Sequence, residues 1–204
     1  MDPVAIANLA LGWLGVSPVS SFDDPSRTAE LLRAQFAGLR RAVLEDRDWT
    51  FATDRMTLAK AEAPEFGFRS RYTIPSNVLR VISVAPGGSE DSPDAFALTL
   101  YPEECGSLAW TREGKYLLAE TDAETLQVRA IVDVEDYSRF SPGFCQALAA
   151  RIAADLCVAL TENARLGTTL AQLYFQKLRD AAANDGRQGS SRTFKATSLA
   201  RRRR

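Results

Sequence analysis

Three clusters of carboxylates are the candidates in this chain for acid–base catalysis or metal binding. They are Glu45, Asp46 and Asp48; Glu103 and Glu104; and Asp133, Glu135 and Asp136. Two carboxylates at a suitable separation serve glycosidases as general acid and general base, so one of these pairs could in principle cleave a glycosidic bond. The cluster at residues 133–136 could also take a divalent cation, although its spacing matches no calcium-binding loop. Acidic clusters are ordinary surface composition, however, so we predict solvated helix ends and loops without a catalytic or metal-binding role.

The chain has no histidine, which removes the commonest metal ligand and the usual proton carrier near neutral pH. A nucleophile–histidine pair is therefore impossible, and the motifs GxxxxGK[ST], GxGxxG and GxSxG are also absent from the sequence. Cys105, Cys145 and Cys157 form no C-x-x-C pair, so we predict buried free thiols in a reducing compartment. These observations lead us to expect a protein that is not an enzyme and that carries no cofactor.

The C-terminal segment, residues 186–204, is strongly basic, whereas the rest of the chain has an excess of acidic residues. Its basic residues are Arg187, Arg192, Lys195, Arg201, Arg202, Arg203 and Arg204. Arginines can neutralise nucleic-acid phosphates or pair with the carboxylates of a protein, and a basic tail can also serve only solubility. Phe194 and Leu199, its only large apolar side chains, favour a protein groove. By composition the segment cannot fold alone, so we predict that residues 187–204 order only on docking.

The chain shows no sign of membrane targeting. Its N-terminal Met-Asp-Pro lacks the basic region of a signal peptide. The most apolar run, residues 147–160, is interrupted by Arg151 and Asp155 and falls short of a membrane span. We therefore expect assembly in a cytoplasm and no membrane partner.

Helix signals lie in the first part of the chain. Asp2-Pro3 and Asp24-Pro25 each place an N-cap residue before a proline at the first helical position. They predict helices over residues 3–14 and 25–46. Apolar residues spaced three and four apart form one stripe along the second helix: Ala29, Leu32, Phe36, Leu39 and Val43.

Helix signals return near the C-terminus. Ser141-Pro142 repeats the cap before an alanine-rich, apolar helix over residues 144–160, which we expect to be buried. Thr168 or Thr169 is predicted to cap a last helix, and Asn184-Asp185-Gly186 is predicted to end it.

The middle of the chain has the composition of β-structure. β-Branched and aromatic runs separated by turn residues predict strands at residues 68–74, 78–84, 95–101, 108–111, 116–118 and 126–134, with a polar loop at 87–93. We predict an α+β protein: a bundle of four main helices with an inserted small, mostly antiparallel β module and an extended C-terminal tail. The divisions are an N-terminal helical part (1–66), the β module (67–137), a C-terminal helical part that packs on the N-terminal helices (138–185) and the basic tail (186–204).

Several short motifs follow one another in a fixed order. The segment AIANLALGWLG at residues 5–15 precedes DDPS at 23–26, DWTFA at 48–52 and FGF at 66–68. YTIP at 72–75, LRV at 79–81, Tyr137 and FSP at 140–142 come next, before the alanine-rich helix. In order and spacing they resemble the motifs of phage head-to-tail adaptor (connector) proteins, the tail tubular protein A type of short-tailed phages. The resemblance extends to about Asp185 and departs at Ser76-Asn77, where that family usually has an acidic residue.

The resemblance implies a structural protein of the virion at the head–tail junction. It implies a homo-oligomeric ring, dodecameric in that family, which lies beneath the portal protein and through which packaged DNA passes without sequence-specific binding. The C-terminal tail, with its basic residues, Phe194 and Leu199, would bind the portal, and the β module would meet a tail or nozzle protein. Two alternatives remain open: a tail-associated cell-wall hydrolase, and a DNA-binding module that uses the arginine-rich tail.

The motif residues also have plain physical interpretations. We predict structural roles for Trp49, Phe51, Tyr72, Pro75 and Arg80. Trp49 and Phe51 are expected in the core, Pro75 at a rigid corner between two strands, and Arg80 in an ion pair on a strand.

Overall fold

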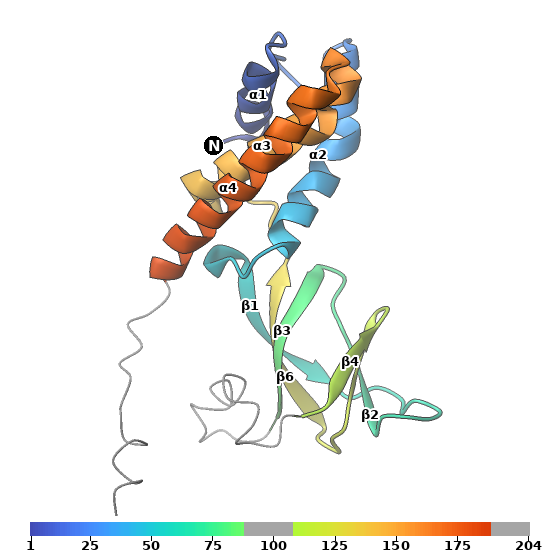
Figure 1. Ribbon diagram of the computed structural model, residues 1–204. Helices are drawn as coiled ribbons and strands as arrows, with labels where there is room; N and C mark the ends of the chain where they lie inside the picture. Colours follow the sequence, from blue (N-terminus) through green and yellow to red (C-terminus); the bar gives the residue numbers. More distant parts are fainter. Residues whose placement is uncertain (88–107, 189–204) are drawn as a thin grey trace, which may run out of the picture.

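A computed structural model describes residues 1–87 and 108–188 of the chain. It is an α+β protein whose four helices form one layer and whose two small antiparallel sheets form a β module at the other end (Figure 1). The described elements are α1 (Pro3–Leu14), α2 (Arg27–Glu45), the 3₁₀ turn η1 (Thr50–Ala52), β1 (Thr53–Ala59), β2 (Ser70–Thr73), β3 (Val78–Pro86), β4 (Trp110–Glu113), β5 (Tyr116–Ala119), β6 (Thr125–Val132), the 3₁₀ turn η3 (Tyr137–Arg139), α3 (Pro142–Thr161) and α4 (Ala164–Gln188).

Side-chain caps fix where the first three helices begin. The Asp2 carboxylate accepts a hydrogen bond from the backbone N–H of Ala5, and the Ser141 hydroxyl caps α3 in the same way, as predicted. The predicted start of α2 at Asp24-Pro25 is wrong by two residues, because Ser26 is its N-cap. Asp24 instead accepts hydrogen bonds from Ser20 and Ser21 in the preceding turn.

The predicted bounds of the last helix were also wrong. α4 begins at Ala164, and the side chain of Asn163 accepts a hydrogen bond from the N–H of Leu166. The Thr168 and Thr169 hydroxyls donate to carbonyl groups four residues back, so they lie inside the helix and do not cap it. α4 also continues through the predicted stop at residues 184–186 to Gln188, which places Arg187 in the helix and outside the expected tail.

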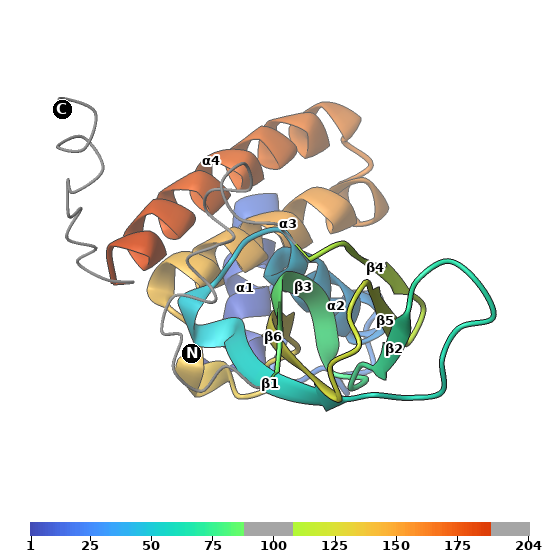
Figure 2. The same ribbon diagram turned by 90° about the horizontal axis from the view of Figure 1, so that it is seen from below.

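α3 is the central helix of the bundle. Seen from below, it runs between α4 on one side and α1 and α2 on the other (Figure 2), and all three pack against it. α4 packs closely on Gly143, where an added Cβ would lie 3.1 Å from the Cβ of Ala181. α3 is long and apolar enough to meet a membrane-span criterion. In this fold its apolar residues instead supply much of the buried core.

The β module consists of two three-stranded sheets, ordered β1-β6-β3 and β2-β5-β4. An isolated bridge between Lys60 and Tyr72 joins them on one side. On the other side Arg112 of β4 donates hydrogen bonds to the carbonyls of Leu79 and Val78, at 2.6 and 3.2 Å. These carbonyls lie beside the register shift of β3, so the guanidinium closes the module where the ladder is irregular.

Strand β1 was not predicted from the sequence, and it lies in the range assigned to the N-terminal helical part. It pairs with β6 from Thr53↔Ile131 to Ala59↔Thr125. Only Leu58 of the strand is buried, because β1 is an edge strand with one largely solvated face. The apolar alternation that reveals a strand is therefore weak here. The predicted strand at 95–101, most of the loop at 87–93 and Cys105 lie outside the described residues.

Candidate functional site at the junction of helices and sheet

The candidate site is the region where the helical layer meets the β module. The chain leaves the helices after Glu45, the last residue of α2, and enters β1 at Thr53. It returns after β6 through residues 133–141 to α3. α2 also contacts β3 and β6, so this helix connects the helical layer with the β module.

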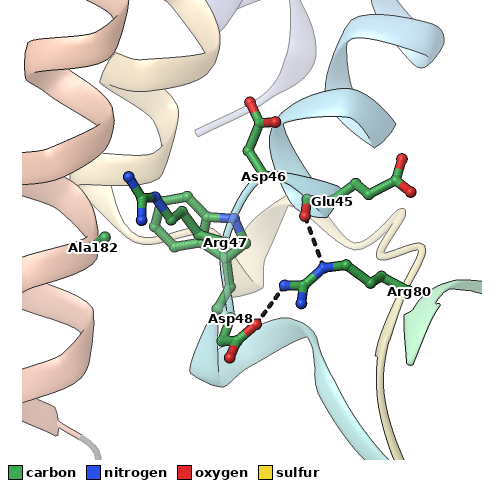
Figure 3. Close-up of a pocket in the computed structure, with 7 residues that line it drawn as sticks. Glu45, Asp46, Arg47, Asp48, Arg80 and Ala182 are labelled. Atoms are coloured by element: carbon green, nitrogen blue, oxygen red, sulfur yellow. Dashed lines mark hydrogen bonds and ion pairs between the residues drawn. The ribbon is translucent and has the colours of Figure 1, made fainter. Parts of the chain in front are cut away.

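Arg80 of β3 braces the end of α2. Its Nε donates a 3.0 Å hydrogen bond to the carbonyl of Glu45, and its Nη2 pairs with the carboxylate of Asp48 (Figure 3). The Glu45 carbonyl belongs to the last turn of the helix, where carbonyls have no partner within the helix and a cation is favourable. Arg80 therefore lies in an ion pair on a strand, and the pair links the two layers.

An open hollow of about 680 Å³ surrounds this brace. Its lining residues are Glu45, Asp46, Arg47, Asp48, Trp49, Arg80 and Ala182. Figure 3 shows Ala182 on the α4 side and Arg80 on the β3 side, with the 45–49 segment between them. The hollow therefore lies where α2, α4 and β3 come together.

A second brace lies on α2 itself. Arg40, almost wholly buried, donates to the Asp133 carboxylate at 2.8 Å, to Glu135 at 3.3 Å and to the hydroxyl of Tyr137 at 3.2 Å. Arg41 binds the other oxygen of Asp133 at 2.7 Å. Desolvation by itself lowers the pKa of Arg40, but its bond to Tyr137 and the charge of Asp133 outweigh that effect, so the pKa lies above its ordinary value. The guanidinium is therefore held in its charged form as a fixed link between α2 and the segment after β6.

An aromatic cluster forms the apolar core of the junction. Trp49 is fully buried, and its indole N–H donates a 2.9 Å hydrogen bond to the carbonyl of Val43. Its ring meets that of Phe144 edge-on at 5.0 Å between centroids and that of Phe51 at 5.9 Å. Phe51 in turn packs against Phe140 and Phe144. The DWTFA motif thus provides the core of the junction, with ring geometries that aromatic pairs prefer.

Asp185 of α4 is a functional candidate that the sequence analysis missed. Its carboxylate is buried and accepts hydrogen bonds from the backbone N–H and the hydroxyl of Thr50, at 2.7 and 2.8 Å. It thereby caps η1 and fixes the C-terminal end of α4 to the junction. No sequence pattern points to this contact, because Asp185 and Thr50 lie 135 residues apart in the chain.

Tyr174 makes a further link between α4 and α2. Its hydroxyl donates a hydrogen bond to the Asp46 carboxylate, and the guanidinium of Arg151 lies 5.4 Å from its ring centroid. Burial first, and the bond to Asp46 second, raise the pKa of Tyr174 above its ordinary value. The phenol is therefore held neutral as a hydrogen-bond donor.

The other two motif residues lie in the β module. Tyr72 is buried, and its hydroxyl donates a 2.6 Å hydrogen bond to the carbonyl of Ala123. Burial raises the pKa of the Tyr72 phenol. Pro75 is exposed between β2 and β3, and its carbonyl accepts from the N–H of Val78 at 3.1 Å. The structure therefore brings Trp49, Phe51 and Arg80 together and leaves Tyr72 and Pro75 apart from them.

Several carboxylates of the predicted clusters have structural partners. Asp46 accepts from Tyr174, Asp48 pairs with Arg80, and Asp133 is shared by two arginines. Asp136 accepts from the N–H and hydroxyl of Ser138, which lowers its pKa. Within residues 1–87 and 108–188 no group of three or more His, Cys, Asp or Glu side chains could hold a metal ion. Glu103 and Glu104 lie outside the described residues. The arrangement can brace two layers of the fold, and it presents no pair of unengaged carboxylates at the junction.

Of the residues predicted to bind the portal, only Arg187 is described, in the last turn of α4. Arg192, Phe194, Lys195, Leu199 and Arg201 to Arg204 lie outside the described residues.

No model of a known protein family matches the sequence, and no curated protein matches it.

Proposed function

We propose that this protein is a structural subunit of the head–tail junction of a phage virion. It is a ring-forming adaptor that binds the portal protein through its basic C-terminal segment and a tail or nozzle protein through other surfaces, around the path of the packaged DNA. The resemblance of the ordered motifs in residues 5–185 to head-to-tail adaptors suggests this role. The proposed role includes no catalytic step and requires no cofactor.

The observation that supports the proposal best is the attachment of α4 to the junction. Asp185 holds the end of α4 to Thr50, three residues before the last described residue, Gln188. The basic segment therefore starts from a fixed point on the body. A segment tethered at a defined position has a high effective concentration near a neighbouring protein, so it binds that protein more readily than the same segment would as a free peptide.

Truncation after Gln188 tests the role of the segment. The cut keeps Asp185, so the shortened subunit should remain soluble and folded. We expect it to be lost from phage heads that lack tails when the mixture is sedimented, whereas the full chain should cosediment. Retention of the truncated subunit at the level of the full chain would contradict portal binding through this segment.

Substitution of Arg201 to Arg204 separates charge from geometry. Four lysines keep the charge but lose the bidentate guanidinium fork, and four glutamines lose both. We therefore expect cosedimentation to fall in the order arginine, lysine, glutamine. Equal retention of the wild type and both variants would exclude these arginines from the contact.

Two assays address the alternatives. Turnover of purified peptidoglycan that is lost in Glu45→Gln would favour the cell-wall hydrolase. Salt-dependent DNA binding that is lost on truncation after Gln188, with normal retention on heads, would favour the DNA-binding module.

A further inference from the structure

Two phenylalanine side chains of the described residues are largely exposed to solvent. Phe66 is 86% exposed and Phe175 is 60% exposed, and few large apolar side chains of the described residues are as open. Phe66 lies in the loop between β1 and β2, and Phe175 lies on α4. Aromatic side chains are enriched in the cores of protein–protein interfaces, so these two are candidates for contacts with another protein.

The loop that carries Phe66 is held at its base. The N–H of Ala61 donates a 2.7 Å hydrogen bond to the carbonyl of Arg71, whose guanidinium returns a 2.8 Å bond to the carbonyl of Glu62. The same guanidinium lies 4.4 Å from the ring centroid of Tyr116. The loop projects from the β module, away from the helical layer (Figures 1 and 2). Phe66 is therefore presented outward from a braced base and cannot be covered by the helices of its own chain.

A basic residue lies beside Phe175. Arg179 follows one turn later on the same face of α4, is exposed and makes no ion pair or side-chain hydrogen bond among the described residues. The acidic residues of α4 lie elsewhere, since Asp185 is buried against Thr50 and Asp180 is about 140° away around the helix from Phe175. This face thus combines an open phenyl ring with a positive charge.

The residue beside Phe66 has the opposite charge. Glu65 directly precedes Phe66, is exposed and makes no ion pair or side-chain hydrogen bond within the described residues. Glu62 lies at the base of the loop, where its carboxylate is 3.9 Å from the guanidinium of Arg71, and the segment from Ala61 to Phe68 has no basic residue. The Glu65 carboxylate at the tip argues against an anionic lipid surface or a nucleic acid, and it favours a protein surface with a basic residue.

We propose that copies of this chain associate head to tail, with Phe66 and Glu65 of one copy docked on Phe175 and Arg179 of the next. The two surfaces differ and lie in different layers of the fold, so the contact is heterologous and generates a closed ring or an open filament. The proposal deepens the adaptor function and rests on it for the closed ring, because it names the surfaces through which the ring would form.

Sedimentation velocity of the full-length chain over a range of concentrations tests the contact. Phe66→Ser and Phe175→Ser should each weaken association on the order of tenfold or more, and the double variant should be little weaker than either single one. Glu65→Arg and Arg179→Glu should each weaken it several-fold, and combining them should restore part of the loss. Glu113→Arg reverses an exposed charge on the β4–β5 hairpin and is the matched control. Unchanged circular dichroism and melting temperatures would show that each variant is folded.

The outcomes separate the contact from the proposed function. A wild-type chain that stays monomeric at the highest attainable concentration, or charge-reversal variants that behave as Glu113→Arg does, would overturn the contact. Rings that assemble on the portal with both phenylalanines replaced would overturn the contact and leave the adaptor role standing. Association through this contact without any binding to heads would support the contact and overturn the adaptor role.

Discussion

Replacing Asp133 with alanine should lower the free energy of unfolding by about 3 kcal/mol. The side chains of Arg40 and Asp133 are only 4% and 9% exposed, and 2.8 Å separates their charged atoms. Removing one partner of a buried ion pair leaves the other charge buried and costs about 3–5 kcal/mol. The lower end of this range applies here, because Arg40 keeps Glu135 and Tyr137 as partners. The Glu135 carboxylate is 75% exposed, so solvent screens it and it replaces only part of the lost interaction.

Arg41→Ala is the matched control for this prediction. Arg41 binds the same carboxylate at 2.7 Å, but its side chain is 55% exposed, so solvent screens the pair. Its loss should cost no more than about 1 kcal/mol. Urea unfolding followed by circular dichroism gives both values, provided that the dependence on urea stays the same for all variants.

A double-mutant cycle then isolates the pair itself. Arg40→Met combined with Asp133→Leu should recover most of the loss, because apolar residues of similar size can replace a buried ion pair at little cost. We expect a coupling energy of about 2 kcal/mol between the two positions. A cost for Asp133→Ala below about 1 kcal/mol, with no coupling, would refute the reasoning. It would mean that water or Glu135 replaces the lost carboxylate and that the junction does not depend on this brace.

Three further predictions concern single sites. Gly38→Ala should raise the free energy of unfolding by about 0.5–1 kcal/mol, since Gly38 is inside α2 with nothing within 4 Å of an added Cβ; Gly143→Ala should give no such gain, because its Cβ would press on α4, and equal gains in urea unfolding would contradict this close approach. The pKa of Tyr174 is raised in the folded state, so its contribution to stability is complete below about pH 10 and is lost as pH rises through the folded pKa. Tyr174→Phe should therefore reduce the loss of stability at alkaline pH. An unchanged dependence of the free energy of unfolding on pH would show that Tyr174 does not contribute to it. Burial raises the pKa of the Cys145 thiol, so a variant with Cys145 as its only cysteine should react with Ellman's reagent far more slowly when folded than in urea, and equal rates would contradict its burial.

The helices were predictable where their signals are local. Asp2-Pro3 and Ser141-Pro142 bring a cap and a fixed φ to the first turn, and α1 and α3 begin there. Local signals failed at the last helix. Thr168 and Thr169 are good caps by type, but nothing in the sequence distinguishes a cap from a hydroxyl that donates to a carbonyl four residues back. Residues 184–186 likewise have the composition of a helix stop, yet the contact of Asp185 with Thr50 lies within a helix that continues past them.

What the sequence determined by itself is the α+β class, the position of the β module between helices, and the absence of histidine chemistry. These follow from residue types and from periodicities of two and 3.6 residues, which a short stretch of chain contains. The roles of Arg40, Arg80 and Asp185 at the junction, and the exposure of Phe66 and Phe175, became visible only in the folded structure. Each of these facts depends on residues distant in sequence: Arg40 meets Asp133 across 93 residues, and β1 is a strand because β6 lies beside it. Burial and pairing are properties of the packed chain, so the side chains that hold the layers together become identifiable only once both layers are in place.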